Sequence, residues 1–312
     1  MSKPHTILGA GGAIANNLVP ILLENGEKVR LVSRSGKSQK DCETRKADVL
    51  DKLALKAALE GSSIVYLLIG IEYNIKQWQQ KWPVIMQNAL DICSELNIPL
   101  IFFDNVYMYG RVSGEMTEET PFKPVSKKGE VRAHIATMLL DAVKAGKVKA
   151  TIARSADFYG PYSQEVSFFH QLLLVNQLKG KKGQLMISAD QPHSMTYTRD
   201  AAAGIYAIAK DTSAYNQTWH LPTASPALTG KELGTIAAKY TGSPEKLTVL
   251  SRFMIKLAGL FIPAIKESVE MLYQFDSPYH FNSKKFEKHF GILPTSYEEG
   301  LKRTIEFYRS HV

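Results

Sequence analysis

Cysteine is scarce in this chain, which has only two among its 312 residues, Cys42 and Cys93. Two thiols cannot form the disulfide framework of a small secreted domain, and they cannot supply a cysteine-rich zinc site. No HExxH motif, closely spaced cysteine pair or carboxylate cluster indicates a metal centre either. We therefore expect no metal ion, and we expect the protein to work in the reducing cytoplasm.

The chain also lacks an apolar run long enough to cross a membrane. Residues 4–23 carry no Asp, Glu, Lys or Arg, but glycine, asparagine and proline interrupt the apolar residues there. Residues 253–265 are apolar apart from Lys256, and this stretch is too short for a hydrocarbon core of about 30 Å. The sequence thus predicts neither a signal peptide nor a membrane span, and we expect no membrane partner.

The charge of the chain does not point to a macromolecular partner. It has 38 Lys and Arg against 30 Asp and Glu, so its formal net charge is +8. A basic excess is compatible with nucleic acid, an anionic membrane or a phosphorylated small molecule. The basic residues are scattered, however, and we find no helix-turn-helix, zinc-finger or aromatic RNA-binding signature. We expect a small-molecule substrate and no nucleic acid.

Short apolar segments alternate with helical patterns in the first half of the chain. Strands that alternate with helices are joined by right-handed crossovers and form a parallel sheet. We predict an α/β fold, a Rossmann-type doubly wound parallel sheet with a smaller, interleaved C-terminal region. The predicted strands are 6–8, 28–32, 42–47, 64–69, 100–103 and 149–153, and the predicted helices are 13–24, 51–59, 75–96 and 127–145.

The pattern loosens after about residue 159, where proline, glycine and short helices dominate. We therefore assign residues 1–160 to a dinucleotide-binding core. Residues 161–312 are expected to form mainly a substrate-capping region, with the last elements of the core interleaved.

A glycine-rich turn, GAGGAIA at residues 9–15, joins the first strand to the first helix. Glycine at 9 permits a tight turn, glycine at 12 lets the backbone approach a pyrophosphate, and the small Ala15 allows close packing of the helix. Such a cluster can be a plain strand–helix turn, but the flanking strand and helix favour a dinucleotide site. Expected cofactor contacts are Gly9, Gly11, Gly12, Ala13 and Ile14, together with Leu68 and Ile69 at the end of the fourth strand.

The residues after the second strand bear on which dinucleotide binds. An acidic residue there would hold the ribose hydroxyls of NAD. The sequence instead has Ser33, Arg34 and Lys37, which suit a 2′-phosphate, although they also fit a solvated basic loop. We favour NADP over NAD. Asp48 and Val49 are placed to contact the adenine, and a helix-capping role for Asp48 is the alternative.

Further motifs resemble the extended short-chain dehydrogenase/reductases, the NAD-dependent epimerase/dehydratase family, over nearly the whole chain. The glycine turn is similar to the form GxxGxxG, with Ala15 in the third place. Residues 108–110 resemble the V-Y-G after the fifth strand, residues 154–161 resemble R-x-x-N-x-Y-G-P, and residues 193–201 resemble H-x-x-x-Y-x-x-D-x-A. The resemblance implies an NAD(P)-binding oxidoreductase or epimerase/dehydratase with a small polar substrate, a class that includes sugar-nucleotide-related compounds.

The catalytic signature that this resemblance implies is not present. Asn105 stands where a serine or threonine is expected, and Lys128 and Arg132 occupy the places of the tyrosine and lysine of Tyr-x-x-x-Lys. Lys128 could serve as the acid/base and Arg132 could bind the ribose, while Tyr107 or Tyr109 could supply a phenol. Asn105 could donate to a carbonyl oxygen. Alternatively, the two cations form a solvated helix start or bind an anion without chemistry.

Four further residues are candidates for substrate contacts. Asp157 and Tyr159 follow a strand, at the edge where α/β proteins bind ligands. Tyr73 is a candidate for the wall of the pocket, and His193 for a contact to the substrate. The alternatives are helix packing for the aromatic residue and a capping or surface role for the histidine.

The missing tyrosine–lysine pair leaves a second function open, a non-catalytic sensor that binds NADP and reports to a partner. The resemblance also implies a homodimer through the long helices near 75–96 and 127–145.

Overall fold

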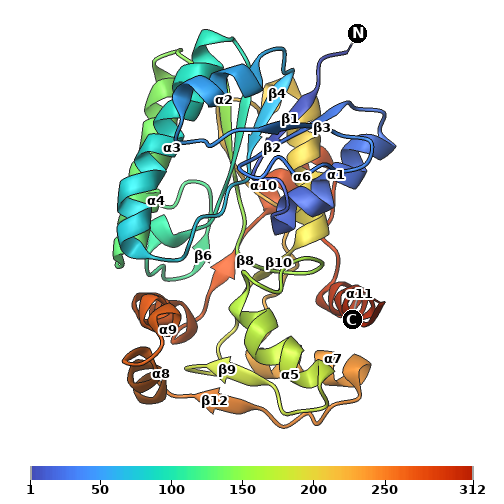
Figure 1. Ribbon diagram of the computed structural model, residues 1–312. Helices are drawn as coiled ribbons and strands as arrows, with labels where there is room; N and C mark the ends of the chain where they lie inside the picture. The colour runs from blue at the N-terminus through green and yellow to red at the C-terminus, as the bar shows by residue number, and fades with distance from the viewer. Residues whose placement is uncertain (1, 311–312) are drawn as a thin grey trace.

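A parallel β-sheet of seven strands forms the centre of the molecule, and the computed structural model describes residues 2–310 around it. The strand order is β11-β7-β5-β4-β1-β2-β3, and every neighbouring pair runs parallel. This architecture confirms the predicted Rossmann-type α/β fold (Figure 1). The strands are β1 (His5–Leu8), β2 (Val29–Ser33), β3 (Glu43–Lys46), β4 (Ile64–Leu67), β5 (Leu100–Asp104), β7 (Ala150–Arg154) and β11 (Thr218–His220).

Helices cover both faces of this sheet. Helices α1 (Ala13–Glu24) and α6 (Thr198–Lys210) share one apolar core with it. On the opposite face lie α2 (Lys52–Leu59), α3 (Ile75–Glu95) and α4 (Lys127–Lys144). A strand covered on both faces must be apolar throughout. Accordingly, β4 reads Ile-Val-Tyr-Leu and all of its residues are buried.

The predicted strands and helices of the first 153 residues are confirmed, with bounds that differ by one or two residues. The predicted helix 13–24 coincides with α1, and the predicted strand 64–69 ends two residues earlier, at Leu67. Two elements that complete the sheet layers come from much later in the chain. Strand β11 pairs with β7 at the edge, and α6 packs beside α1.

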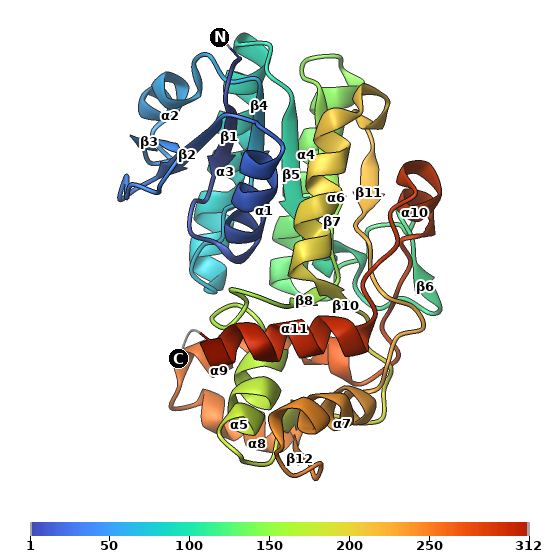
Figure 2. The same ribbon diagram turned by 90° about the vertical axis from the view of Figure 1, so that its right-hand side faces the viewer.

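A second layer, which we call the cap, lies beyond the carboxyl ends of the strands (Figures 1 and 2). Helix α11 runs between the core and the other cap helices in Figure 2. The cap consists of α5 (Val175–Leu178), α7 (Gly230–Thr241), α8 (Arg252–Gly259), α9 (Pro263–Ser268), α11 (Tyr297–Ser310), β9 (Gln184–Met186) and β12 (Thr248–Leu250).

Short elements join the cap to the core. The small parallel pairs are β8 (Asp157–Tyr159) with β10 (Met195–Tyr197), and β6 (Glu115–Met116) with β13 (His280–Phe281). The remaining elements are the helix α10 (Lys284–Phe290), the 3₁₀ turns η1 (Tyr107–Tyr109), η3 (Thr212–Ala214) and η4 (Val269–Phe275), and the π-helical turn η2 (His170–Leu174). Within residues 2–310, none of the helices combines the length and the apolar character needed to cross a bilayer.

Candidate functional site

The glycine turn after β1 has a backbone that only glycine adopts without strain. Gly9 and Gly11 have φ values of +102° and +88°. A Cβ atom on Gly9 would lie 2.8 Å from the carbonyl oxygen of Leu68, so the turn presses directly against the end of β4. Two requirements therefore meet at Gly9, a positive φ and the close approach of another backbone.

The amino end of α1 is open to a ligand. Gly12 is its N-cap and makes no side-chain capping hydrogen bond. The helix begins at Ala13, which Ile14 follows. A Cβ on Gly11 would meet no atom within 4 Å, so there is open space beside the turn. Because the free N–H groups of a helix start attract anions, these features fit the diphosphate of a dinucleotide.

A group of cations lies at the end of β2. Arg34 and Lys37 are exposed, and neither has a carboxylate partner within residues 2–310. Ser33 shapes the loop, because its Oγ accepts a hydrogen bond from the N–H of Gly36 over 3.1 Å. In the sheet, Ser33 is the register partner of Lys46 on β3, which brings a third exposed cation to this edge. The sequence reasoning missed Lys46, which the pairing of β2 with β3 places here.

The structure tests the helix-capping alternative for Asp48, which lies just beyond the end of β3. The N-cap of α2 is Asp51, whose carboxylate accepts from the N–H groups of Leu53 and Ala54. The carboxylate of Asp48 instead accepts from the N–H of Leu50 over 2.9 Å. A capping role for Asp48 is therefore wrong, and Asp48 and Val49 form a half-buried turn beyond the strand.

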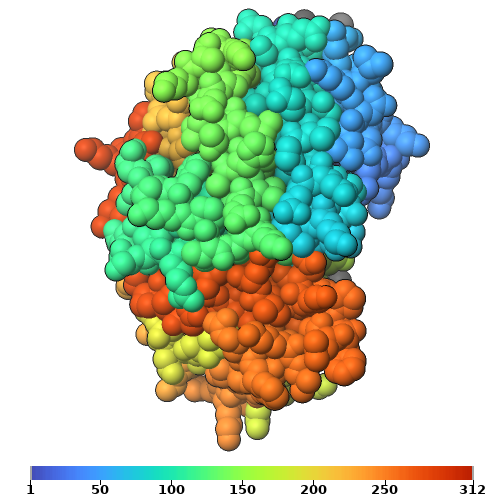
Figure 3. All heavy atoms as spheres, turned by 90° about the vertical axis from the view of Figure 1, so that its left-hand side faces the viewer, coloured from blue at the N-terminus to red at the C-terminus, as the bar shows by residue number. Residues whose placement is uncertain are grey.

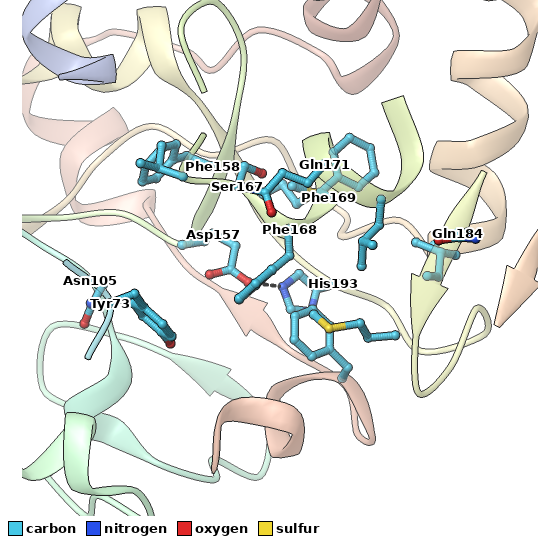
Figure 4. Close-up of a pocket in the computed structure, with 18 of the residues that line it drawn as sticks. Tyr73, Asn105, Asp157, Phe158, Ser167, Phe168, Phe169, Gln171, Gln184 and His193 are labelled. Carbon is cyan, nitrogen blue, oxygen red and sulfur yellow. Dashed lines mark hydrogen bonds and ion pairs between the residues drawn. The ribbon is translucent and has the colours of Figure 1, made fainter. Parts of the chain in front are cut away.

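A cavity of about 480 Å³ lies between the core and the cap. Figure 4 shows Tyr73 and Asn105 on its core side, and Phe168, Phe169 and Gln184 from the second half of the chain. The core contributes loops that follow β4, β5 and β7. A cavity at the carboxyl ends of parallel strands is the usual position of a ligand in a doubly wound fold.

Asn105 and Tyr107 supply polar groups to the core side of the cavity. The Oδ1 atom of Asn105 accepts from the N–H of Tyr107 over 3.1 Å, which leaves its Nδ2 group to donate to a ligand. The ring of Tyr107 stacks on Trp78 with centroids 6.4 Å apart. Burial raises the pKa of Tyr107, and the nearby carboxylate of Asp157 raises this pKa further. The phenol therefore stays protonated at neutral pH and can act as a donor.

Asp157 and His193 both line the cavity and contact each other there. The Nε2 atom of His193 lies 3.0 Å from Oδ2 of Asp157 (Figure 4). The imidazole ring is stacked between Phe275 and Tyr279, with centroid distances of 5.1 and 4.3 Å. Its Nδ1 atom has no hydrogen-bond partner within residues 2–310. The aromatic stacking and the hydrogen bond to Asp157 together fix the orientation of the ring.

The other two predicted substrate contacts have different surroundings. Tyr73 lies on the cavity wall beside Trp78. Burial raises the pKa of its phenol, and the neighbouring phenol of Tyr107 raises this pKa further. Tyr159 is not on the wall. Its side chain is buried against α11, where a Cβ on Gly300 would lie 2.3 Å from its hydroxyl oxygen.

Lys128 is buried at the first turn of α4, away from the cavity wall. Its Nζ atom donates to the carbonyl oxygen of Glu267 over 2.9 Å, to Oε2 of Glu267 over 2.7 Å and to Oε1 of Glu270 over 2.8 Å. An ammonium group has three N–H donors, so this one has none left for a substrate. The ring of Tyr73 lies 4.6 Å from the same nitrogen.

Arg132, one turn further along α4, is also buried and does not line the cavity. Its Nη1 atom lies 3.2 Å from Oδ1 of Asp104, and its guanidinium lies over Trp78 and Trp82 at 4.9 and 4.2 Å. These contacts hold the guanidinium beneath the ends of the strands rather than in open space.

Sequence reasoning missed the charged network to which Arg132 belongs. Asp104 and Arg154 are register partners at the ends of β5 and β7, and both are fully buried. Arg154 donates to the hydroxyl of Tyr109 over 2.7 Å, and Tyr109 lies 2.8 Å from Nε2 of His220. The signal that could have found this network is a charged residue at the carboxyl end of each of two apolar strands.

Comparison with known proteins relates the chain to one family. A family model described as the NAD dependent epimerase/dehydratase family matches residues 5–220. A dTDP-glucose 4,6-dehydratase of Mycolicibacterium smegmatis is 26% identical over 200 residues, which cover 62% of this chain and 53% of that protein. The chain spans about half the length of the curated relatives it matches.

Solved structures share the fold over nearly the full length. The UDP-glucose 4-epimerase of Thermotoga maritima, solved with UDP-glucose, superposes with a TM-score of 0.81 at 17% identity and covers 99% of both chains. The dTDP-glucose 4,6-dehydratase of Bacillus anthracis, solved with NAD, gives a TM-score of 0.80 at 17% identity, with 98% and 97% covered. At such low identity the likeness concerns the fold.

Proposed function

This chain belongs to the NAD-dependent epimerase/dehydratase family, and from that premise we propose that it is an NAD(P)-dependent enzyme that oxidises or reduces a small molecule in the cavity. One observation carries the proposal. The glycine turn with its open helix start follows β1, and the polar groups of the cavity follow β4, β5 and β7 of the same sheet. A dinucleotide held at the first position extends along this edge toward the second.

We propose NADP as the cofactor, in preference to NAD. The turn and the start of α1 would hold the diphosphate, and Arg34, Lys37 and Lys46 would hold the 2′-phosphate. When bound, the cofactor supplies or accepts a hydride at the substrate carbon. The structural relatives named above include one solved with NAD, so the preference for NADP rests on the cations at the end of β2.

In the proposed reaction, Asn105 and Tyr107 bind the substrate oxygen. If the bound cofactor gave a hydride to the carbonyl carbon, the carbonyl π bond would break and the Tyr107 phenol would donate its proton to the oxygen. Asp157 and His193 bind a second polar group of the substrate, and Asp48 and Val49 contact the adenine. Lys128 and Arg132 act as positioning residues, because their charged groups are bound to Glu267, Glu270 and Asp104.

Titration with NADPH and NADH tests this proposal first, and absence of affinity for both cofactors would overturn it. Hydride transfer is then followed by nicotinamide absorbance with a panel of carbonyl compounds. Replacing Tyr107 by Phe should lower turnover by roughly 10²- to 10⁴-fold while the affinity for NADPH is kept. Tyr206→Phe is the matched control, because Tyr206 lies on α6 and binds Glu27, remote from the cavity.

A second candidate is a non-catalytic NADP sensor. It is supported by the carboxylate partners of Lys128 and Arg132, which leave neither side chain facing the cavity. The two functions differ in one result, since a sensor binds NADPH but transfers no hydride to any carbonyl compound in the panel.

We also propose that the protein works in the cytoplasm as a homodimer that pairs through α3 and α4. The exposed Val84 on α3 is the kind of apolar residue that such pairing would cover. Sedimentation of the wild type and of Val84→Glu tests this assembly, and a monomeric wild type would contradict it.

A further inference from the structure

Within residues 2–310, His193 is the one basic side chain on the wall of the cavity, and its ring contacts the carboxylate of Asp157. Among the side chains of residues 2–310 that line the cavity, none is Lys or Arg, and the charged ones are Glu72, Asp157 and Glu165. A diphosphate brings two negative charges. In a site without Lys or Arg it would lose water without gaining a fixed opposite charge, and these carboxylates would repel it.

The buried cations beneath the ends of the core strands, Lys128, Arg132 and Arg154, cannot be recruited without breaking other bonds. Lys128 already has an acceptor for each of its N–H donors. Arg132 and Arg154 share the buried carboxylate of Asp104, at 3.2 and 3.7 Å. Removing either arginine would leave the buried carboxylate with one cationic partner in place of two, which is costly.

A helix start next to the cavity is also closed to an anion. Gly230, the first residue of α7, lines the cavity. The Thr229 side chain accepts from the N–H of Glu232, and the Glu232 carboxylate accepts from the N–H of Thr229, so a capping box occupies two of the N–H donors. The carbonyl oxygen of Ala189 occupies a third, that of Lys231. The same box adds a carboxylate at the point where an anion would bind.

The cavity wall has a polar end and an apolar body. Asn105, Tyr107 and the His193–Asp157 pair lie where the core strands end. Aromatic and aliphatic side chains from the second half of the chain form most of the remainder. Uncharged polar side chains lie among them, namely Ser167, Gln171, Gln184, Ser188 and Gln191. The apolar body includes Phe168, Phe169, Leu172, Leu185, Met186 and Leu233.

We infer that the cavity takes an uncharged substrate, an aromatic or long-chain aliphatic ketone or alcohol, and excludes nucleoside diphosphate sugars. The carbonyl or hydroxyl group lies against Asn105 and Tyr107, and the hydrocarbon body lies against Phe168 and its apolar neighbours. Burying the hydrocarbon supplies the affinity, and the polar groups that contact the substrate oxygen fix the orientation. This inference rests on the proposed function and names its substrate class.

The test is calorimetric titration of the protein loaded with NADP⁺, which cannot reduce a ketone, with three probes, 4-phenyl-2-butanone, 2-decanone and UDP-glucose. Saturable binding of at least one ketone and none of UDP-glucose at millimolar concentration is expected. Saturable binding of UDP-glucose, or binding of neither ketone, overturns the inference. If the cofactor itself fails to bind, the proposed function has failed. If the cofactor binds and the ketones do not, only the substrate class has failed.

Two phenylalanine variants separate the cavity from the outer surface. Phe168→Ala removes an aromatic face of the cavity and should weaken ketone binding about tenfold, since a buried aromatic contact is worth on the order of 1.4 kcal/mol. Phe261→Ala is the matched control, because that side chain is 81% exposed on the outside of the cap. An equal loss in both variants would show that the ketones bind the surface instead.

Discussion

The Nζ atom of Lys128 lies 2.7 Å from Oε2 of Glu267, and this ion pair joins α4 of the core to α9 of the cap. Figure 3 shows the orange residues of the cap meeting the cyan and green residues of the core along a seam on this side of the molecule. A position expected from the sequence to carry an acid/base group thus holds the two layers together. The proposed positioning role of the lysine follows from this contact, because it fixes the cap that covers the cavity.

Replacing Lys128 by Met should destabilise the protein by about 3 kcal/mol, because the carboxylates of Glu267 and Glu270 lose their common partner. Urea denaturation gives the free energy of unfolding. The triple variant Lys128→Met, Glu267→Gln, Glu270→Gln is the control and should recover much of the loss. An undiminished unfolding free energy in Lys128→Met would contradict this structural role.

The double variant Arg34→Ala, Lys46→Ala should bind NADPH roughly ten- to a hundredfold more weakly, because each charge-assisted contact contributes about 1.5–3 kcal/mol before screening by solvent. The affinity for NADH, which has no 2′-phosphate, should not change. Fluorescence titration measures both. Lys28→Ala is the control, since Lys28 is an exposed cation just before β2, at the opposite end of the strand. A parallel loss of NADH affinity would argue against the phosphate assignment.

Substituting Ala for Gly9 should abolish cofactor binding and lower stability by more than the same change at Gly26. Both glycines have positive φ, +102° and +74°, so both alanines carry backbone strain of about 1–3 kcal/mol. Only at Gly9 does the new Cβ also collide with another backbone, 2.8 Å from the oxygen of Leu68. Thermal unfolding and NADPH titration of Gly9→Ala and Gly26→Ala separate the effect of backbone strain, which both variants share, from that of the collision with Leu68, which only Gly9→Ala has.

The free energy of unfolding should decrease in mild acid, because two buried histidines bind protons more readily in the unfolded chain than in the folded protein. Burial lowers the pKa of His220 to about 3 and that of His170 to about 4. In the unfolded chain both titrate near 6.5, so between these values the unfolded state binds more protons. The free energy of unfolding is therefore fully present above about pH 6.5. It falls as the pH drops, by up to about 1.4 kcal/mol per pH unit for each histidine.

Urea denaturation at several pH values between about 4 and 7 measures this slope, because that range includes the reference histidine pKa of about 6.5. His220→Gln should flatten the slope, because the group that binds the proton on unfolding is gone. Trp219→Phe, next to it in β11, is the control and should lower stability at every pH without changing the slope. An unchanged slope in His220→Gln would refute the assignment.

Local signals predicted the core of the fold. Apolar runs such as 64–69 identified buried strands, because a strand covered on both faces has no polar side. The glycine turn at 9–15 was visible because a tight turn and a close backbone approach each demand a residue without a side chain. The cations Arg34 and Lys37 were visible because they directly follow a strand.

The cap could not be derived in the same way. Its helices are short, their apolar faces pack on segments far along the chain, and strands such as β9 and β12 have only three residues. The pairing of Asp104 with Arg154 and of Ser33 with Lys46 depends on the register between strands. No spacing within the sequence encodes that register.

The sequence by itself determined a parallel α/β core with a dinucleotide turn, because local backbone and burial requirements restrict the residue at each of those positions. The tertiary structure alone decided the environments of the charged residues. Lys128 and Arg132 lie on one helix, four positions apart, yet the carboxylates that bind them come from the cap and from β5. Whether a cation is available to a ligand depends on partners brought from distant segments, and only the folded packing fixes those partners.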